Sequence, residues 1–362
     1  MEDSRQMQMI CRYTCESFAK TKISMYNVNT AITEVAMKKS IVLLVLAFLT
    51  MLLVACNGTA DRDIIVTHYT QYDFIKTIVG DDLTVGMAIA PGVEAHGYEP
   101  TSKNIVAINR AKLFVFTSDL FDPWAESAVE TSNTTTVVLD LSTKIDVAAI
   151  DHDHEHLAAS HGSYDSLVLL DEHDHEGIDP HYWTDLVVAM QMVDALLEQL
   201  IAIWPDHAEA FTLRGEALHE ELHELHEDIA AYFETIPEEQ RVIYHAGHIN
   251  LAYFAARYHM TVVALTEQYA PDGDPTSAQI AQMIERLRSD GATTLFYEEL
   301  SEAQVAKTIQ SELSRNGTAI ELRLFHGIHN VSLADFNAGV TYLELMEANF
   351  ANIRSALPVN GA

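Results

Sequence analysis

The chain has 362 residues, of which 53 are acidic, 21 are basic and 18 are histidine, and its formal net charge is −32. Hydrophobic residues make up 48% of it, which is enough to fill the cores of two ordinary domains and excludes a disordered chain. The acidic excess argues against nucleic acid as a partner, because a protein that binds a duplex needs a basic face to displace phosphate counterions. This charge favours a cation instead.

The front of the chain predicts a signal peptide. Residues 37–40 contain two lysines, Lys38 and Lys39, and residues 41–56 form an apolar run that is too short to span a membrane comfortably. The end of this run, Leu53-Val54-Ala55-Cys56, resembles the bacterial lipobox, in which small residues precede a cysteine that is lipidated and becomes the mature N-terminus. We therefore expect a lipoprotein signal peptide over 37–56 with a lipid on Cys56, the alternative being an ordinary signal peptide with an incidental cysteine. Residues 1–36 carry no comparable pattern and are interpreted as an over-extended N-terminus.

All cysteines lie before the first histidine in the chain. The three cysteines are Cys11, Cys15 and Cys56, so the rest of the chain can form no internal disulfide and no thiolate metal site. All 18 histidines follow Cys56 and begin at His68, so a metal there must use His, Asp or Glu. Residues 1–56 hold 4 acidic and 6 basic residues, which leaves 49 acidic and 15 basic residues and a net charge of −34 beyond them.

From residue 61 onward, short β-rich runs alternate with helical runs. The expected strands are 64–67, 83–90, 112–117 and 136–141, and the expected helices between them are 71–79, 102–110 and 123–130. Such alternation is typical of a parallel sheet covered by helices, since each crossover must bury its apolar stripe on the sheet. We therefore expect an N-terminal α/β domain over 61–205. It contains an acidic, His-rich stretch at 151–176 whose composition predicts a surface loop.

Two helical runs follow this loop. Residues 184–203 are apolar at helical spacing, and about 206–234 form a longer run that Pro237 ends. The apolar face of the longer run consists of Leu218, Leu222, Leu225 and Ile229. We predict that residues 206–235 form a helix that links two domains.

The alternation then restarts and repeats the first half. The expected strands are 241–244, 261–265, 293–297 and 319–325, and the expected helices are 249–258, 277–289, 302–315 and about 333–356. The sequence thus predicts two α/β domains of the (β/α)4 type with parallel sheets, the second over 236–357, with a cleft between them. Ligands of open parallel sheets bind beyond the carboxyl ends of the strands, so a site is expected in this cleft.

Histidines stand where such a site would lie. They are His96 after the second strand, His181 at the entry of the helix 184–203, the pair His245 and His248 after the strand 241–244, and the pair His326 and His329 after the last strand. A single histidine in a loop is typically solvated. Four such loops form a constellation that predicts a metal site.

These residues resemble the metal-binding, cluster 9 solute-binding proteins of bacterial ABC transporters, which take up zinc or manganese. The resemblance covers about residues 62–357, and its most specific motifs are Pro-Gly-x-x-x-His at 91–96, Asp-Pro-His-x-Trp at 179–183 and His-x-x-x-x-Tyr-Phe-x-x-x-Tyr at 248–258. It implies that His96, His181 and His248 are metal ligands. His248 is preferred to His245 because Tyr253-Phe254 then stand at the family spacing.

The fourth ligand of this family is often an Asp in the last strand-to-helix loop. Counted back from Tyr342…Met346-Glu347-Ala348-Asn349, it falls on Asn330 or, with one residue of slippage, on His329, so the sequence departs from the family pattern here. We favour His329, with Asn330 or a water molecule as alternatives. His96 and His181 would then come from the first domain and His248 and His329 from the second, so that a metal closes the cleft.

The type of ligand predicts the metal. Imidazole is well matched to Zn²⁺, whereas manganese sites prefer carboxylates, so we expect Zn²⁺ and keep Mn²⁺ as the alternative. The same ligands would also bind Cu²⁺ or Ni²⁺. The resemblance implies an extracytoplasmic, lipid-anchored binding protein that delivers its metal to an ABC transporter permease and is not an enzyme; we also expect a monomer.

Two other functions are open. His219-Glu220-Glu221-Leu222-His223 matches the H-E-x-x-H motif of zinc metalloproteases, but it lies in a repetitive run of Leu, His and Glu that is typical of an exposed helix face. A metal-storage or adhesion lipoprotein would instead use the His-rich loop 151–176 as its functional part. If the protein is a transport component, this loop would collect metal ions with low affinity near the cleft. Alternatively, it is a solvated acidic loop whose metal affinity has no function.

Overall fold

The structure is a computed structural model that describes residues 62–130, 135–146, 180–248, 250–266, 275–298 and 303–357. The signal peptide, Cys56, Asp179 and the His-rich loop 151–176 lie outside the described residues, so the expectations about them stay predictions.

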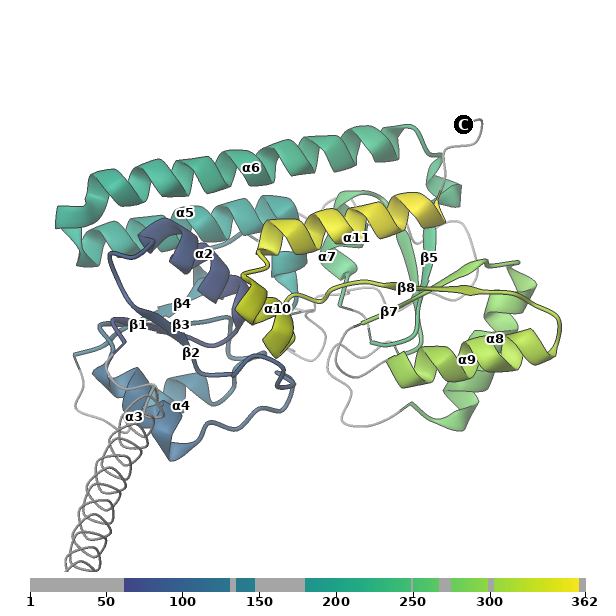
Figure 1. Cartoon of the computed structure of the whole chain (residues 1–362), viewed down its shortest axis with the longest axis horizontal. Coiled ribbons are helices and arrows are strands. Elements are labelled where there is room, and N and C mark those ends of the chain that lie inside the picture. Colours follow the sequence, from purple (N-terminus) through teal and green to yellow (C-terminus); the bar gives the residue numbers. More distant parts are fainter. Residues whose placement is uncertain are drawn as a thin grey trace, which may run out of the picture. The chain divides into compact units, whose positions relative to one another are not determined.

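The first sheet has four parallel strands (Figure 1). They are β1 (Ile64–Val66), β2 (Val85–Met87), β3 (Leu113–Phe116) and β4 (Val137–Asp140), in the order β2-β1-β3-β4. Alternate residues of β1 face opposite layers: Ile64 and Val66 pack in the core cluster that contains α2 (Tyr69–Val79), whereas Ile65 packs in the cluster that contains α3 (Ser102–Arg110) and α4 (Ala125–Glu130). A sheet covered on both faces explains the continuous apolar run of β3.

The second sheet repeats this order. Its parallel strands are β5 (Val242–His245), β6 (Thr261–Ala264), β7 (Thr294–Tyr297) and β8 (Glu321–Leu324), in the order β6-β5-β7-β8. One face packs against α8 (Ser277–Ser289) and α9 (Ala303–Arg315), and Ile243 and Phe296 on the other face join the cluster of α7 (Ala252–Arg257). The predicted α/β class with two four-stranded parallel sheets is confirmed.

Two long helices connect the halves built on these sheets. They are α5 (Leu186–Ile203) and α6 (Ala208–Glu234), with the short helices η3 (Tyr182–Thr184) and η4 (Pro205–His207) before them. Among the described residues α5 is the one helix long and apolar enough to cross a membrane, but much of it is buried in the core against α6. The predicted apolar face of α6 is buried, as are Phe211 near the start of the helix and Phe233 near its end. The ring of Phe233 stacks on that of Tyr258 in the second half.

The prediction of one continuous helix over about 333–356 is wrong, because the structure has two helices there. α10 (Leu333–Ala338) ends at Gly339, whose φ of 74° is left-handed, and α11 (Tyr342–Ala356) begins at Thr341, which forms a capping box with Glu344. The break turns α11 back over α6 and α2 (Figure 1), where the Tyr342 amide donates to Asp73. The C-terminal helix therefore ties the second half to the first.

Candidate metal centre

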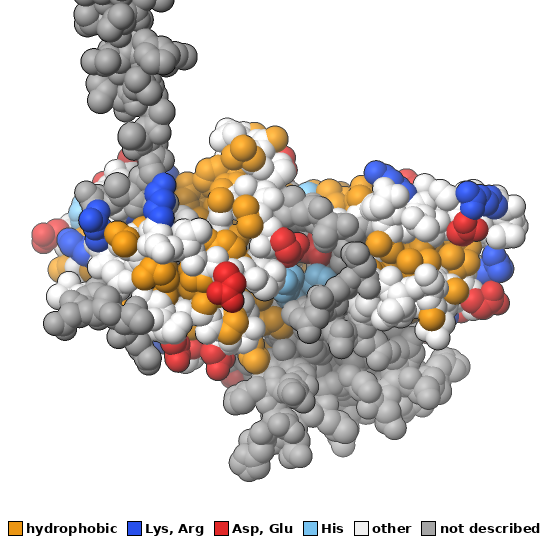
Figure 2. Space-filling model, turned by 90° about the horizontal axis from the view of Figure 1, so that it is seen from below, with side chains coloured by type: hydrophobic (Ala, Val, Ile, Leu, Met, Phe, Trp, Pro, Cys, Tyr) orange, Lys and Arg blue, Asp and Glu red, His pale blue; other side chains and the backbone are white. Residues whose placement is uncertain are grey.

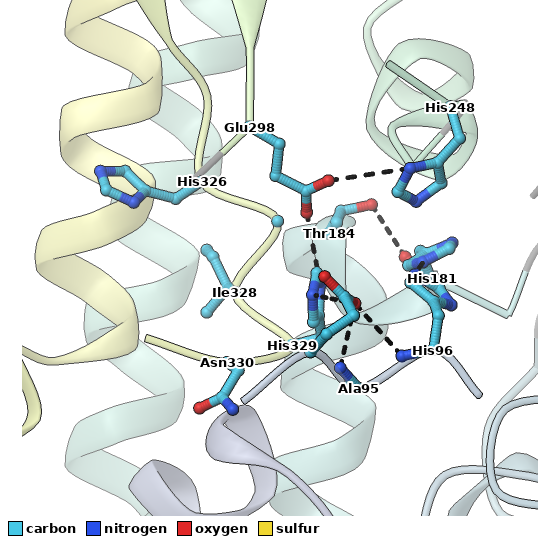
Figure 3. Close-up of polar contacts among 12 residues, drawn as sticks. Ala95, His96, His181, Thr184, His248, Glu298, His326, Ile328, His329 and Asn330 are labelled. Carbon is cyan, nitrogen blue, oxygen red and sulfur yellow. Dashed lines mark hydrogen bonds and ion pairs between the residues drawn. The ribbon is translucent and has the colours of Figure 1, made fainter. Parts of the chain in front are cut away.

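Four histidines from both halves converge at the carboxyl ends of the strands (Figure 3). His96 lies in the loop after β2, His181 caps η3, and His248 and His329 follow β5 and β8. The imidazole nitrogens of His96, His181 and His248 lie within 4.8 Å of one another. In Figure 2, histidine side chains are visible at the middle of the drawn face, beside acidic side chains. The four are called the metal centre below.

The distances within the metal centre suit one small cation. His96 Nε2 and His181 Nε2 are 3.2 Å apart, and the ring of His96 lies 4.9 Å from that of His248 and 5.3 Å from that of His329. Two nitrogens bound tetrahedrally to one Zn²⁺ at about 2.0–2.1 Å would be about 3.3 Å apart. The His96–His181 pair therefore stands at the spacing that a tetrahedral zinc requires, and the rings of His248 and His329 lie within 4.9 and 5.3 Å of the ring of His96 between centroids.

Burial keeps this centre ready for a metal. His181 is fully buried and His248 and His329 are nearly so, whereas His96 is half-buried at the entrance. Desolvation, followed by the charges of the neighbouring histidines, lowers the pKa of His181 well below its usual value. Metal binding needs the neutral imidazole, so His181 offers its lone pair at neutral pH without first losing a proton.

The loop that carries His329 is hydrogen-bonded to the first half, although it follows a strand of the second. Trp183 Nε1 donates to the carbonyl of Gly327 (2.8 Å), Thr70 Oγ1 donates to that of Ile328 (2.8 Å), and the Tyr69 amide donates to that of His329 (3.1 Å). Ile328 is a β-branched residue at a φ of 59°, a conformation that costs about 1–3 kcal/mol and that these bonds maintain. His329 is thus held by the half that does not contain its strand.

The alternatives to His329 and His248 lie elsewhere. The side-chain amide of Asn330 donates to the carbonyls of Ala90 (2.8 Å) and Val93 (2.6 Å), and its oxygen accepts from the Val331 amide, so it serves the loop. His245 is buried at the end of β5 and is in neither group of candidate ligands found among the described residues. The geometry favours His329 over Asn330 and His248 over His245.

Two glutamates that the sequence analysis missed flank His329. Glu94 Oε1 lies 3.7 Å from His329 Nε2 and accepts from the amides of Ala95 and His96, and Glu94, His96 and His329 form a second group of candidate ligands. Burial raises the pKa of Glu94, but its contact with His329, the charges of His329 and His96 and the hydrogen bond from the His96 amide outweigh this and lower it to about 2. Glu298 is 2% exposed, lies after β7 and faces His329 from the other side. The rule that directed attention to strand ends could have found Glu298.

A fifth histidine lies behind the metal centre. His68 is 1% exposed, and its ring lies 4.7 Å from Trp183 and 5.4 Å from Phe121. Phe121 in turn contacts the rings of His96 and His181. These aromatic side chains form an apolar back wall that limits the access of water to the ligands.

The comparison with known protein families identifies the chain. The family described as zinc-uptake complex component A, periplasmic (ZnuA), matches residues 64–356. The chain belongs to the ZnuA family. This confirms the resemblance to metal-binding solute-binding proteins, which are binding components of uptake systems and not enzymes.

Individual ZnuA-type relatives agree with this. The chain is 27% identical over 300 residues to the zinc-binding protein AdcA of Streptococcus pyogenes serotype M3, covering 82% of this chain and 56% of that protein's length. It is 26% identical to the high-affinity zinc uptake system protein ZnuA of Bacillus subtilis, covering 88% of this chain and 97% of the relative. The periplasmic zinc-binding protein TroA from Treponema pallidum has the same fold, with a TM-score of 0.67, 19% identity and coverage of 82% and 99% of the two chains.

The motif of the remote protease alternative lies on the outer face of α6. Glu220 and His223 are exposed, and His219 Nδ1 lies 3.0 Å from Asp194 Oδ1. In the described part of the chain, the groups of three or more close ligand atoms are the two at the cleft, and neither includes these residues. The ZnuA-family fold therefore presents this run as a helix surface.

Proposed function

We propose that this protein captures Zn²⁺ outside the cytoplasm and delivers it to the permease of an ABC importer. The single observation that supports this most is the convergence of His96, His181 and His248 on one point, with His329 beside His96, from four separate loops. Four imidazoles have no structural need to meet at one point in a core. The periplasmic zinc-uptake description of the family supports both the cargo and the location.

The donor set favours zinc over manganese. All four proposed ligands are borderline nitrogen donors, and the two nearby carboxylates, Glu298 and Glu94, lie 3.4 and 3.7 Å from nitrogens of His329. Zn²⁺ accepts four nitrogen ligands, whereas Mn²⁺ prefers oxygen. We therefore propose Zn²⁺ as the cargo, with Mn²⁺ as the competing assignment.

The anchor and the domain limits are also proposals. Cys56 would carry the lipid that holds the protein on the outer side of the cell membrane. The domains would cover residues 61–205 and 236–357, with 206–235 as the linking helix and one chain per functional unit.

The structure refines how zinc would close the cleft. Because the loop of His329 is hydrogen-bonded to the first half, three ligands belong mechanically to that half and His248 alone to the other. Zinc would therefore join the halves mainly through His248. Closure is the signal that we propose the permease reads.

Competitive zinc titration of the chain from Asp61 onward tests this function. We expect one tight zinc per chain in the wild type, and its loss in a triple variant with His96→Ala, His181→Ala and His248→Ala, while weak binding to the loop 151–176 remains. Tight zinc that survives the triple variant would contradict the proposal. A preference for manganese in the wild type would keep the family but contradict the cargo.

Deleting the loop 151–176 separates transport from storage. If the protein is a transport component, the deletion variant keeps its one tight zinc. If metal storage or adhesion is its function, metal capacity collapses with the loop.

A further inference from the structure

One buried carboxylate lies between two of the proposed ligands. Glu298 is 2% exposed, its Oε1 lies 3.4 Å from His329 Nδ1, and its Oε2 lies 3.8 Å from His248 Nδ1 (Figure 3). Each carboxylate oxygen faces a different imidazole, and in both imidazoles the atom that it faces is Nδ1. The Nε2 atom of each ring lies across the ring from this contact, and that of His329 is 3.7 Å from Glu94 Oε1.

The chemistry of imidazole gives this arrangement a consequence. A neutral imidazole carries its one proton on Nδ1 or on Nε2, and only the other nitrogen can bind a metal. A carboxylate at Nδ1 favours the Nδ1–H form, since it accepts that proton's hydrogen bond but repels a lone pair. Carboxylate partners of this kind fix the orientation of metal-bound histidines and raise their basicity.

Gly327 maintains the space that the carboxylate needs. A Cβ atom at this position would lie 1.8 Å from Glu298 Oε1 and 3.0 Å from His329 Nδ1. A side chain here would therefore displace the carboxylate from between the rings. This is independent evidence that the loop is shaped around Glu298.

We propose that Glu298 is a positioning residue that holds both His248 and His329 in the Nδ1–H form and aims their Nε2 atoms at the zinc. The proposal rests on the proposed zinc function and deepens it, because one carboxylate couples the ligand of the second half to the ligand held by the first. The two contacts, at 3.4 and 3.8 Å, are longer than ordinary hydrogen bonds, so the carboxylate acts on the two rings mainly through its charge. Glu298 also supplies a negative charge beside four neutral ligands and a divalent cation.

The replacement Glu298→Gln separates positioning from packing. Glutamine has nearly the same shape, but it offers one acceptor oxygen and one NH₂ donor, so it can serve only one of the two rings. The ring facing the NH₂ group must present a lone pair at Nδ1 and carry its proton on Nε2, where it cannot bind zinc. We expect this variant to bind zinc about 10–100-fold more weakly than the wild type.

Nitrogen NMR of the imidazoles reads the tautomers directly. In the zinc-free, processed full chain extracted with detergent, we expect Nδ1–H at both His248 and His329, and in Glu298→Gln we expect Nε2–H at one of them. Gly327→Ala should weaken zinc binding in the same direction, and Glu312→Gln, at a partly exposed glutamate of α9 that pairs with Arg315, serves as the control and should match the wild type.

Either of two results would overturn the proposal: Nε2–H at His248 or His329 in the zinc-free wild type, or zinc affinity within twofold of the wild type in Glu298→Gln. The wild-type spectrum tests the proposal even if a variant does not fold. This spectrum is recorded without zinc, so it tests the role of Glu298 separately from the zinc function. The zinc function fails if the wild type has no tight zinc site, whereas the role of Glu298 fails if the tautomers differ from those expected.

Discussion

If His329 is a ligand, as we propose, its identity determines the donor set of the metal centre. It is buried, and its ring faces that of His96 with 5.3 Å between centroids. An imidazole here makes the set all-nitrogen, whereas a carboxylate would add an oxygen donor. Selectivity between zinc and manganese therefore depends strongly on this one side chain.

Replacing His329 by Glu tests this dependence. We expect zinc binding to weaken and manganese binding to strengthen, so that the ratio of the two affinities falls at least tenfold, or about 1.4 kcal/mol. Competitive titration with both metals measures the ratio. Asn330→Ala is the matched control, because it removes loop hydrogen bonds but no proposed ligand. A ratio altered only by Asn330→Ala would show that Asn330 is the ligand.

His68 affects stability rather than coordination. Its two ring nitrogens are buried and have no hydrogen-bond partner among the described residues. Desolvation, then the charges of His329 and His96, lower its pKa well below the usual 6.5. As the pH drops below about 6.5, His68 is protonated in the unfolded chain but stays neutral in the folded chain. The free energy of unfolding therefore falls with the pH in this range.

The variant His68→Phe should remove this loss. Phenylalanine suits the space between Phe121 and Trp183 and leaves no polar atom unsatisfied, so we expect about 1 kcal/mol more stability and a shallower decline between pH 7.5 and 5.5. Denaturant unfolding of the metal-free protein at both pH values measures this. His223→Gln, which removes an exposed histidine, is the control. The same decline in His68→Phe as in the wild type would refute the prediction.

Among the helices, a buried ion pair connects the segments that carry two ligands. Asp185, which caps α5 just after His181, is fully buried, and Arg257 of α7 donates to it through Nε at 3.1 and 3.0 Å and through Nη2 at 2.7 Å. α7 closely follows His248 in the chain. The pair therefore holds α7 of the second half against the start of α5 in the first.

Removing Arg257 leaves a buried carboxylate without its charged partner. For Arg257→Ala we expect a loss of about 3 kcal/mol in the free energy of unfolding, measured by denaturant titration of the metal-free protein. Arg286→Ala breaks a more exposed pair with Asp290 and should cost about 0.5 kcal/mol. Equal losses in the two variants would mean that the buried pair contributes no more than a surface pair.

The last two helices show where periodicity alone fails. Residues 333–356 keep a helical pattern, yet Gly339 and the capping box of Thr341 divide them. Both signals are present in the sequence, since Gly favours a left-handed C-terminus and Thr-x-x-Glu favours an N-terminus. Only the packing of Tyr342 on Phe74 and Asp73 shows that both operate here.

At the scale of the whole molecule, the two halves are joined asymmetrically around the metal centre. The amides of Tyr69, Gly92 and Val331 are hydrogen-bonded in or to the loop of His329. His248 belongs to the other half and follows β5. We therefore expect bound zinc to constrain mostly the segment of His248.

Hydrogen exchange with and without zinc tests this asymmetry. We expect zinc to slow amide exchange over residues 250–258 by at least tenfold and to change Tyr69, Gly92 and Val331 much less. The His248→Ala variant should lose the effect. The largest slowing at the loop of His329 would mean that this loop, and not the segment of His248, closes on the metal.

The sequence by itself determined the class of the fold and the kind of site. Alternating strand and helix patterns predict two parallel sheets, because each crossover must bury an apolar stripe, and parallel strands bring the histidines after them to one edge. The donor type then predicts zinc. These conclusions need only local patterns and rules that hold for every parallel sheet.

Only the tertiary structure decided which side chains face one another. His245 and His248 are three residues apart, and His329 and Asn330 are adjacent, so spacing does not choose between them. The choice depends on loop conformations held by bonds across the two halves, such as those of Asn330 to Ala90 and Val93 and of Trp183 to Gly327. Glu298 and His68 likewise acquire a role only through what lies beside them, because a buried polar group is determined by its neighbours in space and not by its neighbours in the chain.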